Sequence, residues 1–172
     1  MMNRREFVIT SAAAAFWRPS FVLPTDVTIV QFSDTGERQG KARVAKVEKS
    51  NAEWRKQLSP LAFQVARQGG TEHPFSGEYW NLHERGLFRC VCCANALFVS
   101  ADKFDSGTGW PSFTAPIAEE NVVHGKPSHG YTESEVTCVR CDAHLGDLFD
   151  DGPKPTGLRY CIDSVSLRFV KF

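Results

Sequence analysis

Two pairs of cysteines with the spacing C-x-x-C are the residues of this sequence best placed to do chemistry. They are Cys90 with Cys93 and Cys138 with Cys141. Each pair can present two thiolates on one side of a tight turn, and two pairs together give the four-sulfur shell that Zn²⁺ prefers. Four cysteines leave no open coordination position, so we expect a structural metal that stabilises the fold. Two disulfides, or a redox-active C-x-x-C pair, are the alternatives.

Two further cysteines, Cys92 and Cys161, are left over for other chemistry. Cys161 follows Arg159 by two residues, so both side chains lie on the same side of an extended chain. A nearby guanidinium favours the thiolate, which is the reactive form of cysteine. A cysteine beside a strand is also commonly an inert core residue, so the residue types alone leave a nucleophile open. His144 and Trp110 can equally be structural.

The composition limits the classes of protein to consider. The 172 residues allow one domain with a sizeable core, with or without a short leader. Twenty basic residues balance twenty acidic ones, which gives no charge argument for nucleic acid or an anionic membrane as partner. A hydrophobic fraction of 42% is that of an ordinary globular protein and excludes a disordered chain.

The first 25 residues have the pattern of an export signal. Arg4 and Arg5 precede an apolar stretch from Val8 to Trp17, which is too short for an ordinary membrane span. The paired arginines resemble a bacterial twin-arginine signal, so we expect a periplasmic protein, membrane-anchored if the leader is not cleaved. A hydrophobic anchor or a core helix is the alternative reading. Residues 26–172 are then the folded domain.

The pattern of the rest of the chain predicts two helices followed by short strands. Residues 26–32 alternate as a strand does. Ser50, three before Glu53, predicts a helix start, and a second helix is expected between Ser59 and Gly69. Further strands are expected at 97–99, 136–139, 145–149 and 164–169.

Eight ordered segments resemble the methionine-R-sulfoxide reductases, the B class of methionine sulfoxide reductases. The resemblance runs from about Val44 to the C-terminus. The segments are WRKQLSP (54–60), GTE (70–72), PFSGEY (74–79), FRCVCC (88–93), KFDSGTGWPSF (103–113), CDAHLG (141–146), DGPKPTGLRYC (151–161) and SVSLRF (164–169).

The resemblance implies a mainly β fold of two antiparallel sheets with short N-terminal helices and a structural zinc on the paired cysteines. It implies that Cys161 attacks the sulfur of methionine-R-sulfoxide, chiefly in oxidised proteins, and is left as a sulfenic acid that an external thiol such as thioredoxin reduces. A monomer is expected, with no nucleic-acid partner and no membrane association of the mature chain. The substrate pocket is expected to contain Trp110, His144, Asp147, Arg159 and Asp163.

Three positions depart from the pattern of the family. Asp147 stands where many members have histidine, and Asp163 where they have asparagine; both add potential negative charge near Cys161, which raises the pKa of its thiol unless one carboxyl stays protonated. Thr108 stands where many members have a resolving cysteine, which leaves Cys92 as the only spare thiol in the chain. An exported zinc-stabilised binding module without the chemistry, or a disulfide-bonded oxidoreductase, therefore remains an alternative to the enzyme.

Overall fold

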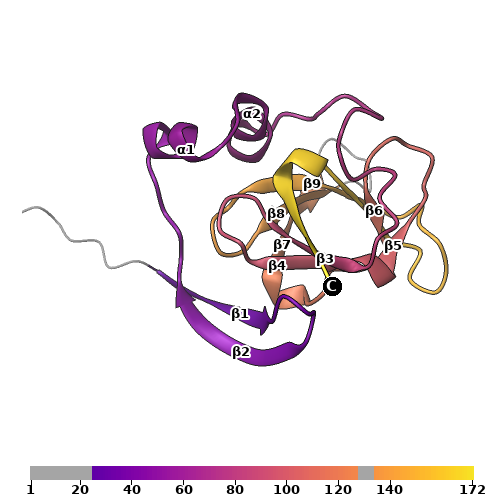
Figure 1. Cartoon of the computed structure of the whole chain (residues 1–172), viewed down its shortest axis with the longest axis horizontal. Coiled ribbons are helices and arrows are strands. Elements are labelled where there is room, and N and C mark those ends of the chain that lie inside the picture. The colour runs from indigo at the N-terminus through magenta and orange to yellow at the C-terminus, as the bar shows by residue number, and fades with distance from the viewer. Residues whose placement is uncertain (1–24, 128–133) are drawn as a thin grey trace, which may run out of the picture.

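Antiparallel strands form most of the computed structural model, which describes residues 25–127 and 134–172. Two short helices precede the main sheets, and three 3-10 turns interrupt them (Figure 1). The strands and helices are β1 (Asp26–Phe32), β2 (Arg38–Ala45), α1 (Asn51–Gln57), α2 (Pro60–Gln68), β3 (Gly86–Cys90), β4 (Ala96–Val99), β5 (Lys103–Phe104), β6 (Ser112–Phe113), β7 (Val122–Pro127), β8 (Ser134–Cys138), β9 (His144–Phe149), β10 (Arg159–Ile162) and β11 (Leu167–Lys171).

Two antiparallel sheets make up the main body. A six-stranded sheet has the order β5-β6-β10-β9-β8-β7, and a three-stranded sheet has the order β11-β3-β4. The predicted mainly β fold with N-terminal helices is confirmed. The strand expected at residues 26–32 is confirmed as β1. Its pairing with β2 into a separate hairpin was not expected, and this hairpin lies to one side of the body (Figure 1).

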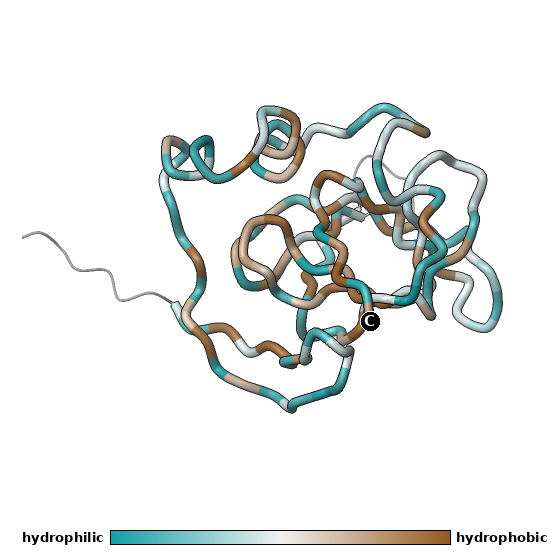
Figure 2. Tube along the Cα trace, in the orientation of Figure 1, coloured by the Kyte–Doolittle hydropathy of each residue, from teal (hydrophilic) through white to brown (hydrophobic). Residues whose placement is uncertain are grey.

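The two sheets are joined by a core of aromatic side chains. Phe98 of β4 stacks on Phe113 of β6 with ring centroids 4.5 Å apart, and Phe88 of β3 meets the same ring edge-on at 5.1 Å. All three rings are fully buried. Offset and edge-on pairs of this kind add packing energy beyond the buried area. In Figure 2 hydrophobic residues recur along the inner strands, whereas the outer turns are largely hydrophilic.

The two helices begin and end as the sequence predicts. The Ser50 side chain accepts from the Glu53 amide while Glu53 reaches back to the Ser50 amide, which completes a capping box. The Ser59 hydroxyl caps α2, and Gly69 ends it in the left-handed region at φ 67°. Trp54 of α1 is buried, and the guanidinium of Arg67 from α2 lies 5.0 Å from its ring, so the helices pack as a unit.

The hairpin is attached to the body by polar contacts with its backbone. Ile29 and Val30 are its buried residues. The side-chain amide of Asn121 accepts from the Val30 N–H at 2.7 Å and donates to the Val30 carbonyl at 2.9 Å, as a neighbouring strand would. Arg89 donates to the carbonyl of Phe32 and pairs with Asp34.

The strand expected at 164–169 is wrong in its first half. Ser164–Ser166 form a 3-10 turn, and the strand begins only at Leu167. The buried carboxylate of Glu72 accepts from the amides of Ser164 at 2.8 Å and Val165 at 3.0 Å, which gives these N–H groups a partner outside any ladder. The alternation of residue types was therefore not enough to predict the conformation of residues 164–166, because hydrogen bonds to the distant Glu72 side chain stabilise a turn there.

The expected export signal lies outside the described residues, apart from its last position. Among residues 25–127 and 134–172, no helix has the length and apolar character needed to cross a membrane.

Candidate active site and metal centre

Cys161 lies at a cavity of about 200 Å³ on the six-stranded sheet. Trp110 and Phe149 give the cavity apolar walls, and two carboxyl groups face it from Asp147 and Asp163. The remaining lining residues are Thr71 and Gly146. A space with apolar walls, one thiol and acidic groups can hold a small polar group on an aliphatic side chain.

The position of Cys161 is fixed by strands on both sides. β10 pairs with β6, where Cys161 faces Ser112, and with β9, where it faces Asp147. Gly146 makes the approach of β9 possible, because a Cβ there would lie 2.1 Å from the Cys161 carbonyl oxygen. Its φ of 148° is also one that side chains rarely allow.

The environment of the Cys161 sulfur pulls its pKa in two directions. Burial raises the pKa of the thiol above its ordinary value, and the charge of Asp163 adds to that shift. The Arg159 guanidinium and the Thr108 hydroxyl, whose oxygen lies 4.0 Å from the sulfur, act in the opposite direction. The net shift is upward, so the thiolate is a minor species near neutral pH.

Asp163 is the most deeply buried acid at the cavity. Its side chain is 3% exposed, and Oδ1 accepts the Glu72 amide at 2.8 Å. Burial raises the pKa of this carboxyl to about 7, and the charges of Glu72 and Asp147 also raise it. The hydrogen bond from the Glu72 amide lowers the pKa, but burial is the larger effect.

His144 lies behind Asp163 and is not one of the cavity residues. Its Nδ1 is 2.8 Å from Oε1 of Glu135 on β8, and its Nε2 is 3.9 Å from Oδ2 of Asp163. A carboxylate only accepts hydrogen bonds, so Nδ1 carries the hydrogen toward Glu135. In neutral histidine the unprotonated Nε2 then faces Asp163.

Trp110 is held at the cavity through the same segment that supports Asp163. Its indole Nε1 donates to the Glu72 carbonyl at 3.2 Å. Gly109 precedes it at φ 94°, with no room for a Cβ against the Phe75 amide. Glu72 therefore contacts two cavity residues with its backbone and the turn after Asp163 with its carboxylate.

Arg159 faces an adjoining cavity on the Thr108 side of the sulfur. Its guanidinium donates to both carboxylate oxygens of Asp151, at 2.7 and 2.9 Å, and lies 4.2 Å from the Phe149 ring. The two-fold contact fixes the plane of the guanidinium near Cys161. Asp151 holds the pKa of Arg159 above its usual value, so this charge is permanent.

The paired cysteines converge in a second site between the sheets. Cys90, Cys93, Cys138 and Cys141 bring their sulfur atoms within 4.8 Å of one another. The pairs Cys90–Cys141 and Cys93–Cys138 are each 3.6 Å apart, too far for an S–S bond of about 2.05 Å. All six cysteines of the chain lie in described residues and are free thiols. The alternative of two disulfides is therefore wrong for this structure.

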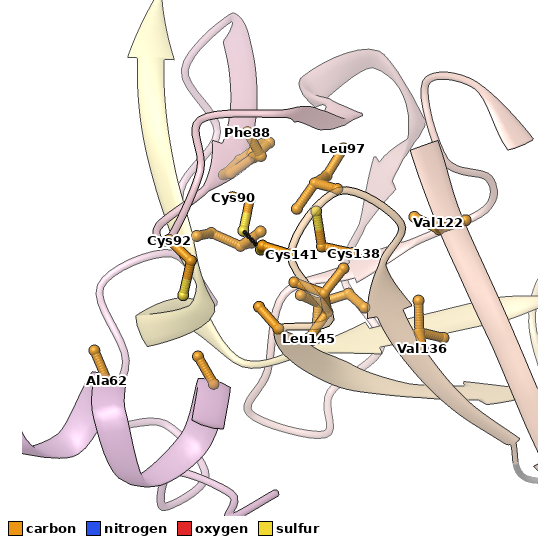
Figure 3. Packing of buried hydrophobic residues seen from close by; sticks show 14 of the residues in the cluster. Ala62, Phe88, Cys90, Cys92, Leu97, Val122, Val136, Cys138, Cys141 and Leu145 are labelled. Carbon is orange, nitrogen blue, oxygen red and sulfur yellow. Dashed lines mark hydrogen bonds between the residues drawn. The ribbon is translucent and has the colours of Figure 1, made fainter. Parts of the chain in front are cut away.

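The spacing of these sulfurs fits a tetrahedral metal ion. Zn–S bonds of about 2.3 Å place neighbouring sulfurs about 3.8 Å apart, close to the distances found here. Cys90, Cys138 and Cys141 lie among core residues in Figure 3. Cys92 is not one of the four, but its thiol contacts those of Cys141 and Cys90. Arg67 donates to the Cys141 carbonyl at 2.6 Å. The positive charge of Arg67 would partly compensate the net negative charge that four thiolates around a divalent cation would have.

Sequence comparisons identify the family of the chain. The family model of the SelR domain matches residues 58–171. A peptide methionine sulfoxide reductase MsrB of Hahella chejuensis is 53% identical over 125 residues, which are 72% of this chain and 90% of the relative. The protein of the same name from Pseudomonas putida is 54% identical over 123 residues, 71% of this chain and 94% of the relative.

The chain belongs to the methionine sulfoxide reductase B family.

The family region contains the complete cavity and the complete cysteine cluster. It begins at Leu58, so α2 and every later element lie inside it. The hairpin of β1 and β2 precedes the region. Helix α1 precedes the region as well.

The structure brings together four of the residues predicted from the sequence at one cavity: Cys161, Trp110, Asp147 and Asp163. Arg159 reaches the same sulfur from the adjoining cavity, and His144 contacts Asp163. Sequence reasoning missed three supporting acids, Glu72, Glu135 and Asp151. Two of them stand in the segments that carry the family resemblance, but nothing in their spacing indicates their partners.

Proposed function

We propose that this chain reduces the R epimer of methionine sulfoxide, chiefly in oxidised proteins, with Cys161 as the nucleophile. Membership of the family makes it a peptide methionine sulfoxide reductase. The observation that carries the mechanism is the position of the Cys161 sulfur at a cavity with an indole wall and acidic groups. A sulfoxide has the matching parts, since its methyl group is apolar and its oxygen accepts hydrogen bonds.

In the proposed reaction the Cys161 thiolate attacks the sulfoxide sulfur while an acid protonates the departing oxygen. The sulfur of the substrate gains two electrons and becomes a thioether. The cysteine sulfur loses two electrons and takes the hydroxyl group, so it becomes a sulfenic acid. Arg159 supports this step because its fixed positive charge stabilises the thiolate.

An external thiol, of which thioredoxin is the expected example, then reduces the sulfenic acid. Thr108 stands beside the Cys161 sulfur and cannot form a disulfide. Cys92 is buried beside the four-cysteine cluster, so it is poorly placed to reach Cys161 as the resolving thiol. Two external thiols give water, a disulfide and the original cysteine, which balances the reaction.

Zn²⁺ is the ion we propose for the four-cysteine cluster. The ligands would be Cys90, Cys93, Cys138 and Cys141, and the ion would supply folding free energy rather than chemistry on the substrate. The set of four sulfur donors and their spacing support this choice.

The place of action we propose is the periplasm, reached as a folded, metal-loaded monomer. Folded export would let the thiols bind metal before the chain meets an oxidising compartment. The support is the Arg4-Arg5 leader pattern. Fractionation of cells that express the full chain, beside a variant with both arginines changed to lysine, tests this. Retention of the double variant in the cytoplasm is expected; equal export of both proteins would overturn the proposal.

The central test is turnover of the separate R and S epimers of a blocked methionine sulfoxide with dithiothreitol. The unmodified chain should act on the R epimer alone, Cys161→Ser should be inactive, and Cys92→Ser should retain activity. Bound zinc is quantified on the same samples, with about one ion per chain expected. Zinc without turnover would show that the chain is a binding module that has lost the chemistry.

A further inference from the structure

The cavity contains a buried carboxyl that the proposed reaction has not yet used. Asp163 lines the same space as Cys161 and is almost completely shielded from solvent. Burial of an isolated carboxylate is unfavourable, so this group has reason to hold a proton. The departing oxygen of a sulfoxide needs one.

The hydrogen bonds of Asp163 define which of its oxygen atoms can carry that proton. Oδ1 accepts the Glu72 amide, so an added hydrogen belongs on Oδ2. Oδ2 is 3.9 Å from His144 Nε2, which is too long for a direct hydrogen bond. The proton is therefore not committed to a strong partner within the protein.

The charges around Asp163 also favour its neutral form. Glu72 and Asp147 both face it, from the segment after α2 and from β9, and their negative charges raise its pKa. His144, from β9 as well, lowers the pKa, as does the Glu72 amide. Cys161 on β10 is coupled to Asp163 in turn, since the carboxylate disfavours the thiolate. A single proton shared by Cys161 and Asp163 relieves that repulsion.

We propose that Asp163 is the general acid of this enzyme, delivering through Oδ2 the proton that the departing sulfoxide oxygen takes. The inference rests on the proposed reductase function. Asp163 accepts the proton of the Cys161 thiol, which generates the thiolate, and then passes it to the oxygen. The pair starts with one proton, on either the thiol or Asp163, and this proton leaves with the oxygen. Thiol and sulfoxide thus become sulfenic acid and thioether, and Asp163 ends as the carboxylate. His144, fixed by Glu135, is a positioning residue for this carboxyl.

The pH dependence of the unmodified chain gives a first test. A reaction that needs one proton on the pair formed by Asp163 and Cys161 rises with pH as Asp163 ionises, near pH 7, and falls above the raised pKa of Cys161. A reaction that needs only the thiolate rises with pH and then levels off above the pKa of Cys161. The single-turnover rate with methionine-R-sulfoxide, without reductant, distinguishes these profiles. A rate that reaches a plateau above the pKa of Cys161, with no fall at higher pH, would overturn the proposal.

The variant Asp163→Asn gives a second test with two opposite readouts. Loss of the acid should lower the single-turnover rate at pH 7 by about 100-fold, the size of a general-acid effect. Loss of its charge should make Cys161 react faster with iodoacetamide, because the thiol pKa falls. A structural role would slow both reactions, and a purely electrostatic role would speed both. Sulfoxide reduction within twofold of the unmodified chain would overturn the proposal.

Controls separate this inference from the function on which it depends. Asp26→Asn removes an exposed carboxyl of β1 and should leave both rates unchanged. The amount of bound metal measures whether each variant is folded. If Asp163→Asn does not retain the metal, the pH profile of the unmodified chain serves as the test of the general acid. Absence of turnover in the unmodified chain and in Asp26→Asn would refute the reductase function itself. Active controls with an equally active Asp163→Asn would refute the general acid alone.

Discussion

Asp147 on β9 lies directly opposite Cys161 on β10 in the antiparallel register. Directly opposed side chains on one face of a sheet have Cβ atoms about 5 Å apart, so the carboxylate and the thiol share an environment. Gly146, the neighbour of Asp147, lets β9 and β10 approach closely, because it has no Cβ to meet the Cys161 carbonyl oxygen. We therefore expect a charge on Asp147 to influence the ionisation of the Cys161 thiol.

Replacement of Asp147 by asparagine should make the Cys161 thiol more acidic. Removal of a negative charge favours the thiolate, and we expect alkylation of Cys161 by iodoacetamide at pH 7 to be about threefold to tenfold faster. Arg159→Gln should slow the same reaction, since the guanidinium lowers the thiol pKa. Mass spectrometry of the labelled peptide measures both. Equal rates in the three proteins would show that these charges do not reach the sulfur.

Gly146→Ala should inactivate the enzyme without a change in any charged group. The new methyl group would meet the Cys161 carbonyl at 2.1 Å, so β10 must move away from β9. We expect at least about 100-fold loss of kcat/KM, because small displacements of catalytic groups have effects of this size. Gly40→Ala, on the hairpin, imposes a similar backbone strain at φ 107° but has nothing within 4 Å of its Cβ position, so it is a control for that strain and should keep activity. Full activity in Gly146→Ala would contradict the strand packing.

Removal of the metal should unfold the region where the two sheets meet. The four cysteines lie at the ends of β3 and β8 and in the turns that follow. Without an ion, repulsion between bare thiolates would replace their bonds to the metal. Cys138→Ser should lose the metal and lower Tm by more than about 10 °C, whereas Cys92→Ser should retain it. Calorimetry with metal analysis measures this effect. An unchanged Tm after complete metal loss would remove the structural role.

Asp163 should make the fold less stable as the pH rises from 4 to 7. Its folded pKa of about 7 lies above the ordinary value, so the folded state binds the extra proton. The stabilisation is complete below the unfolded pKa near 4 and is lost as pH passes through the folded pKa. The free energy of unfolding should fall by up to about 4 kcal/mol in that interval. Urea unfolding of Asp163→Asn should show a smaller fall; an identical slope would contradict the assignment.

The capped helices and the paired cysteines are the parts of the fold that the sequence alone predicts best. Ser50 with Glu53, and Ser59 with Pro60, depend on neighbours a few residues away, so local rules suffice. The C-x-x-C spacing likewise places two thiols on one side of a turn without help from distant residues. The convergence of the four cysteines, the starts of both helices and the end of α2 therefore follow from local sequence alone.

Other features depend on contacts between distant segments and escaped prediction. β2 is polar and largely exposed, and its hydrophobic alternation is limited to Ala42 and Val44. This signal is too short to predict a strand without the pairing to β1. The turn after Asp163 is set by Glu72, far away along the chain. Asp163 appeared in the sequence only as a departure from a family pattern; its burial and its link to His144 required the tertiary structure.

The hairpin in front of the family region sets a practical boundary for protein production. Asn121 is fully buried and uses its side chain on the backbone of Val30, and Arg89 donates to the backbone of Phe32. A recombinant fragment that starts at the family boundary, Leu58, would leave both polar groups exposed in a newly opened apolar surface. Expression plasmids for the enzyme should therefore begin before Asp26, even though every proposed catalytic residue lies further along the chain.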